Sequence, residues 1–363
     1  MTTSSLKWSG NPSRKDKNMS KKNIDIFVPT LKKCGGNKEI VKYFSPLEVD
    51  HSITIFSFWK SSNEVDVSET IKVKYVTNFK ANRVVAILTY PLIILYVYFR
   101  SLVMKDRIII LTHYSTYLLS LMKFTDMYIF IQGEEWNYVN SALFKRLVLY
   151  LIGRGKIITA NSFLESQLLK YGIKSDIKCN IWASNEFLNL DQSDLRDIDY
   201  IFVVRDSPVK RPDLYYEFLS FIDLTRYKIV LITTDEAIID KFDAFNVDMY
   251  LLPSIIKMKE LYGRSKFFLL LSEHEGFGLP PLEAMGSGCL PIMRDCYGPR
   301  LYMTSILGDH ILPTSIRNID LFQQIVSFDF CSYKSHVAYD IFCSGLHNEV
   351  SNLLKIKEHF DEN

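Results

Sequence analysis

The sequence lacks the cysteine patterns of disulfide-rich and zinc-binding proteins. Its six cysteines, at positions 34, 179, 289, 296, 331 and 343, are scattered over 363 residues with no CxxC pair and no metal-ligand spacing. Because disulfides persist mainly in oxidising compartments, we expect reduced thiols in a cytoplasmic protein. The amino-terminal segment also lacks an apolar signal-peptide core, which agrees with that location.

The chain lacks an excess of charge of one sign. It has 43 Lys and Arg against 41 Asp and Glu, so its formal net charge is +2. A nucleic-acid partner is therefore not expected, since such proteins usually carry a strong basic field. Residues 1–22 are polar and basic, and they are predicted to form a disordered tail. Met19 is an alternative start just before the first expected strand.

Long hydrophobic runs are also scarce. The main one, VVAILTYPLIILYVYF at 84–99, is short for a membrane span and has Pro91 near its middle. We expect a buried or interfacial helix here, with peripheral contact at the inner membrane as the leading functional interpretation.

The composition is that of a globular protein, and the length suggests two domains. Apolar segments alternate with helical periods, which predicts α/β architecture with two parallel sheets whose ligand sites lie at the carboxyl ends of the strands. Strands are expected at 23–30, 51–58, 107–115, 127–135, 156–162, 199–206, 227–234 and 266–273. We divide the chain into the tail (1–22), an amino-terminal domain (23–190), a carboxyl-terminal domain (191–330) and terminal helices (331–363).

One stretch carries most of the chemical information, LSEHEGFGLPPLEAMGSGCLPI at 271–292. Gly276 and Gly278 let the backbone approach a ligand and expose its amides, and a helix starting just after them favours a phosphate. Glu275 and Glu283 flank this turn, and a carboxylate accepts two hydrogen bonds from a vicinal diol. A nucleotide-sugar has both a diphosphate and polyol groups.

This stretch resembles the signature of glycosyltransferase family 4, whose members are retaining enzymes with the GT-B fold: two Rossmann-like domains with parallel sheets facing across a cleft. The resemblance implies that Glu275 binds donor-sugar hydroxyls and Glu283 the ribose diol. It also implies diphosphate contacts from the backbone of the turn and helix start, namely Gly276, Phe277, Gly278 and Leu279.

Two cations follow the first strand of the second half, in YIFVVRDSPVKRPDL. Arg205 and Lys210 are placed to stabilise a leaving pyrophosphate, and the family resemblance implies the same. Arg211 replaces the family's common glycine and is an alternative to Lys210 in this role.

The first half offers weaker signals. Gly35 and Gly36 match the glycine loop after the first strand of the family, which implies contact with the donor diphosphate or the acceptor. Asn161 and Ser162 open an expected helix, and helix capping is the simplest explanation for them.

The segment FIQGEEW departs from the family, which often has a histidine there. It resembles a subset of bacterial polysaccharide enzymes that includes rhamnosyltransferase-like members. Glu134 or Glu135 is a candidate to steer or deprotonate the acceptor hydroxyl, and each is equally well explained as a solvated loop residue. His113 is another candidate, and a buried structural histidine remains the alternative.

We therefore predict a retaining, metal-independent glycosyltransferase for hexosyl or deoxyhexosyl transfer, with no cofactor beyond its nucleotide-sugar donor. The expected acceptor is a glycan or lipid-linked glycan of bacterial surface polysaccharide synthesis. The carboxylates of DID (197–199) are interpreted as linker residues, not as a metal site. Two alternatives stay open: another GT-B enzyme, such as an epimerase or phosphorylase, and a non-catalytic partner subunit.

Overall fold

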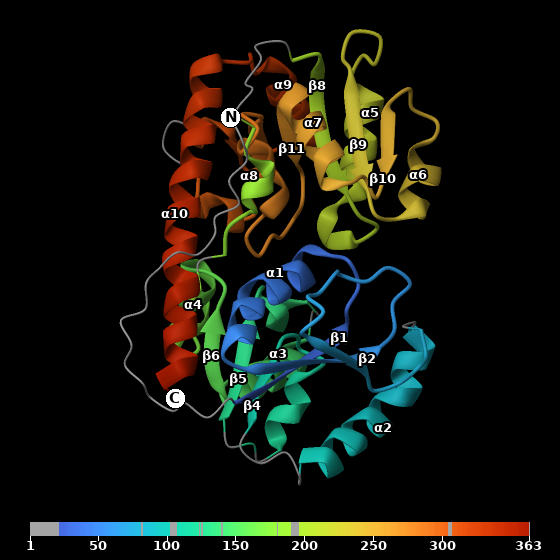
Figure 1. Ribbon diagram of the computed structural model, residues 1–363. Helices are drawn as coiled ribbons and strands as arrows, with labels where there is room; N and C mark the ends of the chain where they lie inside the picture. The colour runs from blue at the N-terminus through green and yellow to red at the C-terminus, as the bar shows by residue number, and fades with distance from the viewer. Residues whose placement is uncertain are drawn as a thin grey trace.

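The computed structural model describes residues 22–80, 83–101, 107–122, 124, 126–138, 141–179, 181–189, 196–303 and 307–362. The predicted basic tail, apart from its last residue, lies outside these residues. Two domains lie one above the other in Figure 1, the amino-terminal domain below and the carboxyl-terminal domain above.

The amino-terminal domain is built on a seven-stranded parallel sheet in the order β3-β2-β1-β4-β5-β6-β7. Its middle strands are apolar along their whole length, because helices and loops cover both faces of the sheet. The strands are β1 (Asn23–Thr30), β2 (Ser52–Trp59), β3 (Lys72–Tyr75), β4 (Arg107–Leu111), β5 (Asp126–Ile131), β6 (Lys156–Thr159) and β7 (Ile177–Lys178).

Helices connect these strands in the right order for parallel pairing. They are α1 (Gly35–Phe44), α2 (Arg83–Ser101), α3 (Ala142–Ile152) and α4 (Ser162–Leu169), with the short 3-10 helices η1 (Ser45–Val49), η2 (Tyr117–Leu121) and η3 (Glu135–Asn137). The chain order reverses between neighbours β1 and β4, so their carboxyl ends diverge into loops on opposite sides.

The carboxyl-terminal domain repeats this arrangement with a six-stranded parallel sheet in the order β10-β9-β8-β11-β12-β13. Its strands are β8 (Ile198–Val204), β9 (Ile229–Thr233), β10 (Asp248–Leu251), β11 (Ser265–Leu270), β12 (Leu290–Arg294) and β13 (Ile311–Leu312). Its helices are α5 (Pro212–Phe221), α6 (Glu236–Phe242), α7 (Ile255–Arg264), α8 (Leu279–Met285) and α9 (Asn318–Ser327), with η4 (Asn185–Phe187), η5 (Pro208–Lys210), η6 (Gly298–Leu301) and η7 (Gly308–His310).

The last helix, α10 (Ser332–Glu362), runs along both domains (Figure 1). Near its start, Ala338 and Phe342 are buried in the carboxyl-terminal core. Near its end, Ile356 and Phe360 are buried in the amino-terminal core. A single helix therefore contributes apolar side chains to both cores, which couples the two domains mechanically.

The predicted central strands are present, with different ends. β4 stops at Leu111 and β5 at Ile131, earlier than predicted, because polar residues beyond these points leave the sheet. Strands β3, β7, β10, β12 and β13 were not predicted. Four of them lie at sheet edges and are two to four residues long, and β12, next to the edge, has five residues, so all are too short for a clear pattern.

Within the described part of the chain, no helix is both long and apolar enough to span a membrane. Segment 84–99 is the predicted helix, but it is only partly buried. Ile93 and Val97 pack inward, while the opposite face remains apolar and exposed. The six cysteines are all free.

Candidate active site

The predicted donor residues gather where the chain order of the carboxyl-terminal sheet reverses. Arg205 and Lys210 follow β8, while Glu275 follows the neighbouring strand β11. A backbone bond from the Glu273 amide to the Val209 carbonyl (2.8 Å) joins the two loops. Parallel-sheet topology therefore places cations and carboxylate together, as expected for a ligand site of a doubly wound sheet.

Lys210 forms the central ion pair of this site. Its Nζ lies 2.7 Å from Glu275 Oε1, and both side chains are largely buried, with 18% and 10% exposure. Arg211 makes a different bond, since its guanidinium is held by Asp213, with Nη2 2.7 Å from Oδ2. Of the two adjacent cations, Lys210 is thus the one that faces the predicted sugar-binding carboxylate, and Arg205 beside them is exposed.

The glycine turn is pressed against the amino-terminal domain. A Cβ added at Gly276 would lie 2.5 Å from the Gln132 carbonyl oxygen, so only glycine fits this contact. Gly278 has a φ of +79°, and its carbonyl accepts a bond from the Tyr302 hydroxyl (2.7 Å). Phe277 is not a surface residue of the turn: its ring is buried between Trp182 and Tyr302.

Asn161 fixes the same turn from across the domain junction. Its Oδ1 accepts a bond from the Leu164 amide (2.9 Å), which caps α4 as predicted. Its Nδ2 donates to the Gly276 carbonyl (3.2 Å), a contact that the sequence did not predict. Asn161 is 1% exposed, so one buried amide serves both domains. Ser162 is exposed at the first turn of α4.

The double glycine lies opposite the start of α8. A Cβ on Gly35 would stand 3.9 Å from Leu279 Cδ1, and one on Gly36 would stand 2.9 Å from Gln132 Oε1. Leu279 packs against the cores of both domains. Gly35 and Gly36 were predicted to lie in a loop, but they are the first residues of α1, and they face Leu279 and Gln132.

The carboxyl group of Glu283 on α8 has a raised pKa. Loss of water around the carboxyl raises its pKa to about 7, and the positive charges of Lys38 and Lys42 on α1 limit the rise. The carboxyl is thus poised between its two protonation states near neutral pH. The charge of these lysines reaches it from the other domain, so Glu283 also belongs to the junction.

The two adjacent acceptor candidates, Glu134 and Glu135, have different environments in the structure. Glu135 is buried at 3% exposure, and burial raises its pKa to about 8 against the opposing effects of Tyr117 and the Tyr114 amide. It is neither a solvated loop residue nor open to an acceptor. Glu134 is only partly buried, and its Oε1 accepts a bond from Asn137 Nδ2 (3.3 Å).

Burial also raises the pKa of Glu134, and the charge of His274 opposes this rise. His274 lies within the signature segment of the other domain and was left out of the sequence prediction, because the family tolerates many residues at its position. Only the tertiary structure brings it close to Glu134.

Tyr138 is a further residue on the amino-terminal side of the candidate site. The Tyr138 hydroxyl folds against Gly133, 2.7 Å from where a Cβ would stand. Loss of water there raises the pKa of Tyr138; the charge of Glu275 adds to the rise and that of Arg205 opposes it. The charges of the donor residues therefore act on Tyr138, which no sequence signal identified.

His113 lies near Tyr138 through Tyr114, is uncharged, and has a structural role. Burial lowers its pKa to about 4, so it is uncharged at neutral pH. Its Nδ1 lies 3.2 Å from the Ser115 amide, which donates to it, and its ring packs on Tyr114. Tyr114 in turn contacts the ring of Tyr138 edge to face.

Away from this junction, the carboxylates of the DID segment are held in ion pairs. Asp197 binds Arg264 and Lys228, and Asp199 binds Lys266. Both Ile198 and Asp199 belong to β8, so the segment enters the sheet and is not wholly linker. Among the described residues, no group of three or more potential ligands is placed to hold a metal ion.

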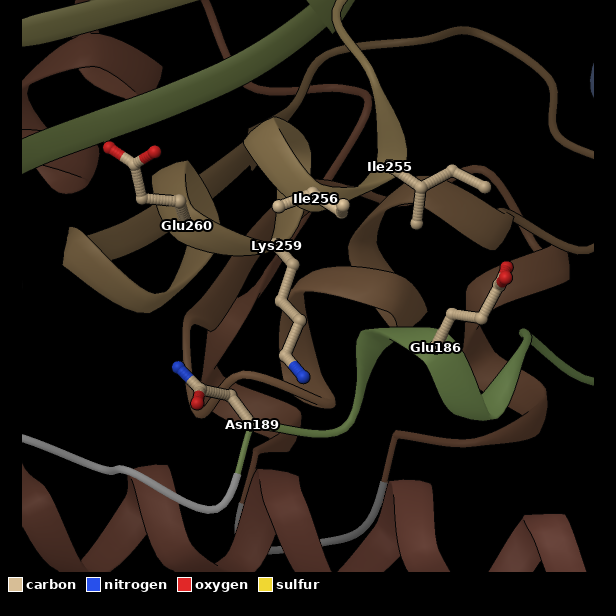
Figure 2. Close-up of a pocket in the computed structure, with 6 residues that line it drawn as sticks. All are labelled: Glu186, Asn189, Ile255, Ile256, Lys259 and Glu260. Atoms are coloured by element: carbon tan, nitrogen blue, oxygen red, sulfur yellow. The ribbon is translucent and has the colours of Figure 1, made fainter. Parts of the chain in front are cut away.

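A hollow of about 520 Å³ lies between α7 and the segment that joins the domains. Figure 2 shows its lining, with Lys259 pointing from α7 toward the space between Asn189 and Glu186. None of the predicted donor residues lines it. This hollow is therefore separate from the group around Glu275.

Two Rossmann-like parallel-sheet domains with the site residues at their junction define the GT-B class of fold. Residues 191–305 match the family model described as "Glycosyl transferases group 1". The matched region holds the carboxyl-terminal site residues, from Arg205 to Glu283. The match is local, since it covers less than half of the chain, and the whole chain has the GT-B fold.

Two curated proteins are similar over short stretches. One, provisionally named glycosyltransferase 41, is from Sulfolobus islandicus filamentous virus (isolate Iceland/Hveragerdi) and is 35% identical over 105 residues, 28% of each chain. The other is GDP-mannose:cellobiosyl-diphosphopolyprenol alpha-mannosyltransferase of Xanthomonas oryzae pv. oryzae (strain PXO99A), 41% identical over 14% of this chain and 13% of that protein. The chain thus spans less than a third of the length of these relatives.

Solved structures are similar over nearly the whole chain. Sucrose-phosphate synthase from Thermosynechococcus elongatus superposes with a TM-score of 0.74 at 12% identity, covering 94% of this chain and 99% of that one. HepE of Anabaena, solved in complex with UDP and glucose, gives 0.68 at 13% identity over 94% and 99%. At these identities the likeness shows the fold alone.

Proposed function

We propose that this protein is a retaining glycosyltransferase that moves a sugar from a nucleotide-diphosphate-sugar to a hydroxyl of a glycan or lipid-linked glycan. The observation that carries the proposal is the Lys210–Glu275 pair at 2.7 Å, set beside Arg205 where the sheet order reverses. A buried pair of this kind offers a cation to a diphosphate and a carboxylate to sugar hydroxyls at one point.

In the proposed reaction, the bond between the sugar C1 and the diphosphate oxygen breaks, and a bond from C1 to the acceptor oxygen forms on the same face. The electron pair of the broken bond stays on the diphosphate, where Arg205 and Lys210 stabilise it. The acceptor proton passes to the leaving phosphate oxygen. Since cationic side chains neutralise the leaving group, we propose that neither a metal ion nor a further cofactor takes part.

The donor arrangement follows from the same geometry. Glu283 accepts bonds from the ribose diol, and the backbone from Gly276 to Leu279, with Gly35 and Gly36 opposite, lines the diphosphate. Before ligand binding Glu275 pairs with Lys210, so donor binding requires Lys210 to exchange one oxygen of Glu275 for a phosphate oxygen. Such an exchange keeps both charges compensated throughout.

On the acceptor side, the proposal assigns Glu134, and not Glu135, to the acceptor hydroxyl, because Glu135 is buried. His274, whose charge acts on Glu134, is proposed to assist it. The mannosyltransferase relative acts, by its name, on a diphosphopolyprenol-linked sugar. We extend that acceptor chemistry to this chain and propose a cytoplasmic role in bacterial surface polysaccharide synthesis.

The deciding experiment is calorimetric titration with UDP-, GDP-, dTDP- and ADP-linked sugars, followed by a transfer assay with the donor that binds. We expect micromolar binding of one nucleotide class, weakened at least tenfold in Arg205→Ala and Glu283→Ala. Arg211→Asn is the matched control, because Arg211 is held by Asp213 and asparagine tolerates its left-handed backbone.

Failure of every nucleotide to bind would contradict the proposal and favour the non-catalytic partner subunit. Release of free epimerised or phosphorolysed sugar without an acceptor would instead favour the other GT-B enzymes. A loss of binding in Arg211→Asn equal to that in Lys210→Ala would move the diphosphate contact to Arg211.

A further inference from the structure

Helix α2 presents an apolar face to solvent. Its inner side is fixed by buried Ile93 and Val97 and by a bond from Trp59 Nε1 to Thr89 Oγ1 (2.8 Å). A helix on a protein surface normally has a polar outer side. Here eight outward side chains are 47% to 70% exposed: Val84, Ile87, Leu88, Leu92, Leu95, Tyr96, Tyr98 and Phe99.

Both α2 and α3 pack on η2, and α3 also exposes apolar side chains. Its exposed apolar side chains are Leu143, Leu147 and Tyr150. η2 is tied to α3 by the bond from Arg154 Nε to the Ser120 carbonyl (2.9 Å), and Leu118 and Leu121 of η2 line a hollow together with α2. We call the exposed side chains of α2 and α3 the outer apolar face.

The hollow between α2 and η2 has a volume of about 410 Å³. Pro91, Ile94, Leu95 and Tyr98 line it from α2, with no charged residue among its lining. Its volume lies in the range of small-ligand pockets, and its lining suits a hydrocarbon chain.

The charges around the outer apolar face identify the partner as an anionic lipid surface. No Asp or Glu occurs in 83–101 or 141–156, whereas the whole chain has 41. Of the cations in these segments, Arg100 at the end of α2 stacks on Phe56, and Lys145 on α3 bonds to Asn137. Arg146 on α3 and Arg154 just after α3 are exposed. Exposed Arg146 makes no ion pair with the described residues.

Aliphatic side chains bordered by tyrosines and cations are typical of helices that lie in a bilayer interface. The exposed face of α2 extends about 22 Å from Val84 to Phe99, long enough to lie on a membrane but not to cross it. In Figure 1, α2 lies at the end of its domain that points away from the carboxyl-terminal domain.

We propose that the outer apolar face docks on an anionic bilayer, with an acyl chain of a membrane lipid entering the hollow between α2 and η2. This extends the proposed function by naming the surface at which a lipid-linked acceptor is met. It does not depend on donor binding, so the two proposals fail separately.

The test is flotation of the full chain with vesicles of 70% phosphatidylcholine and 30% phosphatidylglycerol, compared with pure phosphatidylcholine. We expect the wild type to float with the anionic vesicles. Leu88→Glu/Leu92→Glu should reduce bound protein at least tenfold, since two carboxylates would enter the apolar layer. Val49→Glu is the matched control: Val49 is 74% exposed in the same domain but on η1, and this variant should float like the wild type.

Two further arms separate charge from hydrocarbon contact. Arg146→Gln should lower flotation with anionic vesicles several-fold. Leu121→Trp should add fluorescence that brominated phosphatidylcholine in the anionic vesicles quenches, whereas Val49→Trp should not. Nucleotide-sugar binding should be unchanged in the Leu88→Glu/Leu92→Glu variant, which shows that the protein remains folded.

Absence of wild-type flotation, or equal flotation of the double variant, would overturn the proposal. A concentration-dependent dimer that the double variant abolishes, together with no flotation, would identify a second copy of the chain as the occupant. Loss of nucleotide-sugar binding with flotation intact would contradict the proposed function while leaving the membrane surface in place.

Discussion

The two domains have the same strand order around their central strands and differ in what lies where that order reverses. In the carboxyl-terminal domain, Lys210 and Glu275 form an ion pair there, and Arg205 follows the same strand as Lys210. In the amino-terminal domain, burial keeps His113 and Glu135 in their neutral forms at pH 7. One architecture therefore supports a charged half, which holds the Lys210–Glu275 ion pair, and a neutral half, in which His113 and Glu135 are buried and uncharged.

The largest effect should come from the charged half. Lys210→Ala is expected to lower the rate of sugar transfer roughly a hundredfold to a thousandfold, because it removes a fixed charge from the leaving diphosphate. Steady-state kinetics of the purified variant would measure this. Arg211→Asn should retain transfer within a few-fold, and an equal loss in both variants would erase the distinction between the two cations.

In the neutral half, we expect the ionisation of Glu135 to have a large effect on the free energy of unfolding. The pKa of Glu135 is raised to about 8, above its unfolded value, so the folded state holds the proton more tightly. The stabilisation is complete at low pH and is lost as pH rises from about 4.5 to 8. Glu135→Gln, which cannot ionise, should flatten this dependence by on the order of 3 kcal/mol between pH 5 and pH 8.

Urea unfolding at a series of pH values would measure this difference. Glu134→Gln is the control, since Glu134 is more accessible. A wild-type stability that rises from pH 5 to pH 8 and does not respond to Glu135→Gln would contradict a buried neutral carboxyl.

Glu283 lies between the two halves, and the effect that we expect from its protonation is intermediate in size. With its pKa raised to about 7, it is mostly ionised at pH 8 and mostly protonated at pH 6. The ionised carboxylate accepts both bonds of a ribose diol, so donor affinity should fall about tenfold from pH 8 to pH 6. Calorimetry with Glu283→Gln should show weaker binding that no longer varies with pH in this window.

The smallest effect concerns the contact between the halves. Asn161→Ser should keep the cap of α4 but lose the bond to the Gly276 carbonyl, which weakens donor binding a few-fold at unchanged melting temperature. Asn161→Ala should lose the cap as well and cost about 1 kcal/mol of unfolding free energy. Equal donor affinity in wild type and Asn161→Ser would show that this bond does not position the turn.

The carboxyl-terminal site was predictable because its chemistry lies in one continuous segment and one nearby loop. Glycines, prolines and carboxylates at fixed spacing constrain the backbone locally, so Glu275 and Glu283 could be named before any fold was known. The sequence named Lys210 for the diphosphate and left Arg211 as an alternative, and only the structure shows that Arg211 is held by Asp213.

The amino-terminal site was predicted less well, because its members come from separate loops. Glu134 and Glu135 are adjacent in sequence, and nothing in their spacing indicates that one is buried and one partly exposed. Tyr138 and His274 had no sequence signal, since their roles depend on which loop of the other domain they meet. The exposure of α2 was likewise undecided, because an apolar helix has the same sequence in a core and at an interface.

By itself, the sequence determined the alternation of apolar strands with helices, the glycine turn and its flanking carboxylates, and the absence of acidic residues from 83–101. These are local properties, set by backbone preference and by hydrophobicity. The tertiary structure decided which side chains meet: Gly276 with Gln132, Asn161 with both domains, Glu134 with His274. Such contacts join residues far apart in the chain. Packing also removes water from around Glu135 and Glu283, and this loss of water sets their protonation, so it exists only in the folded protein.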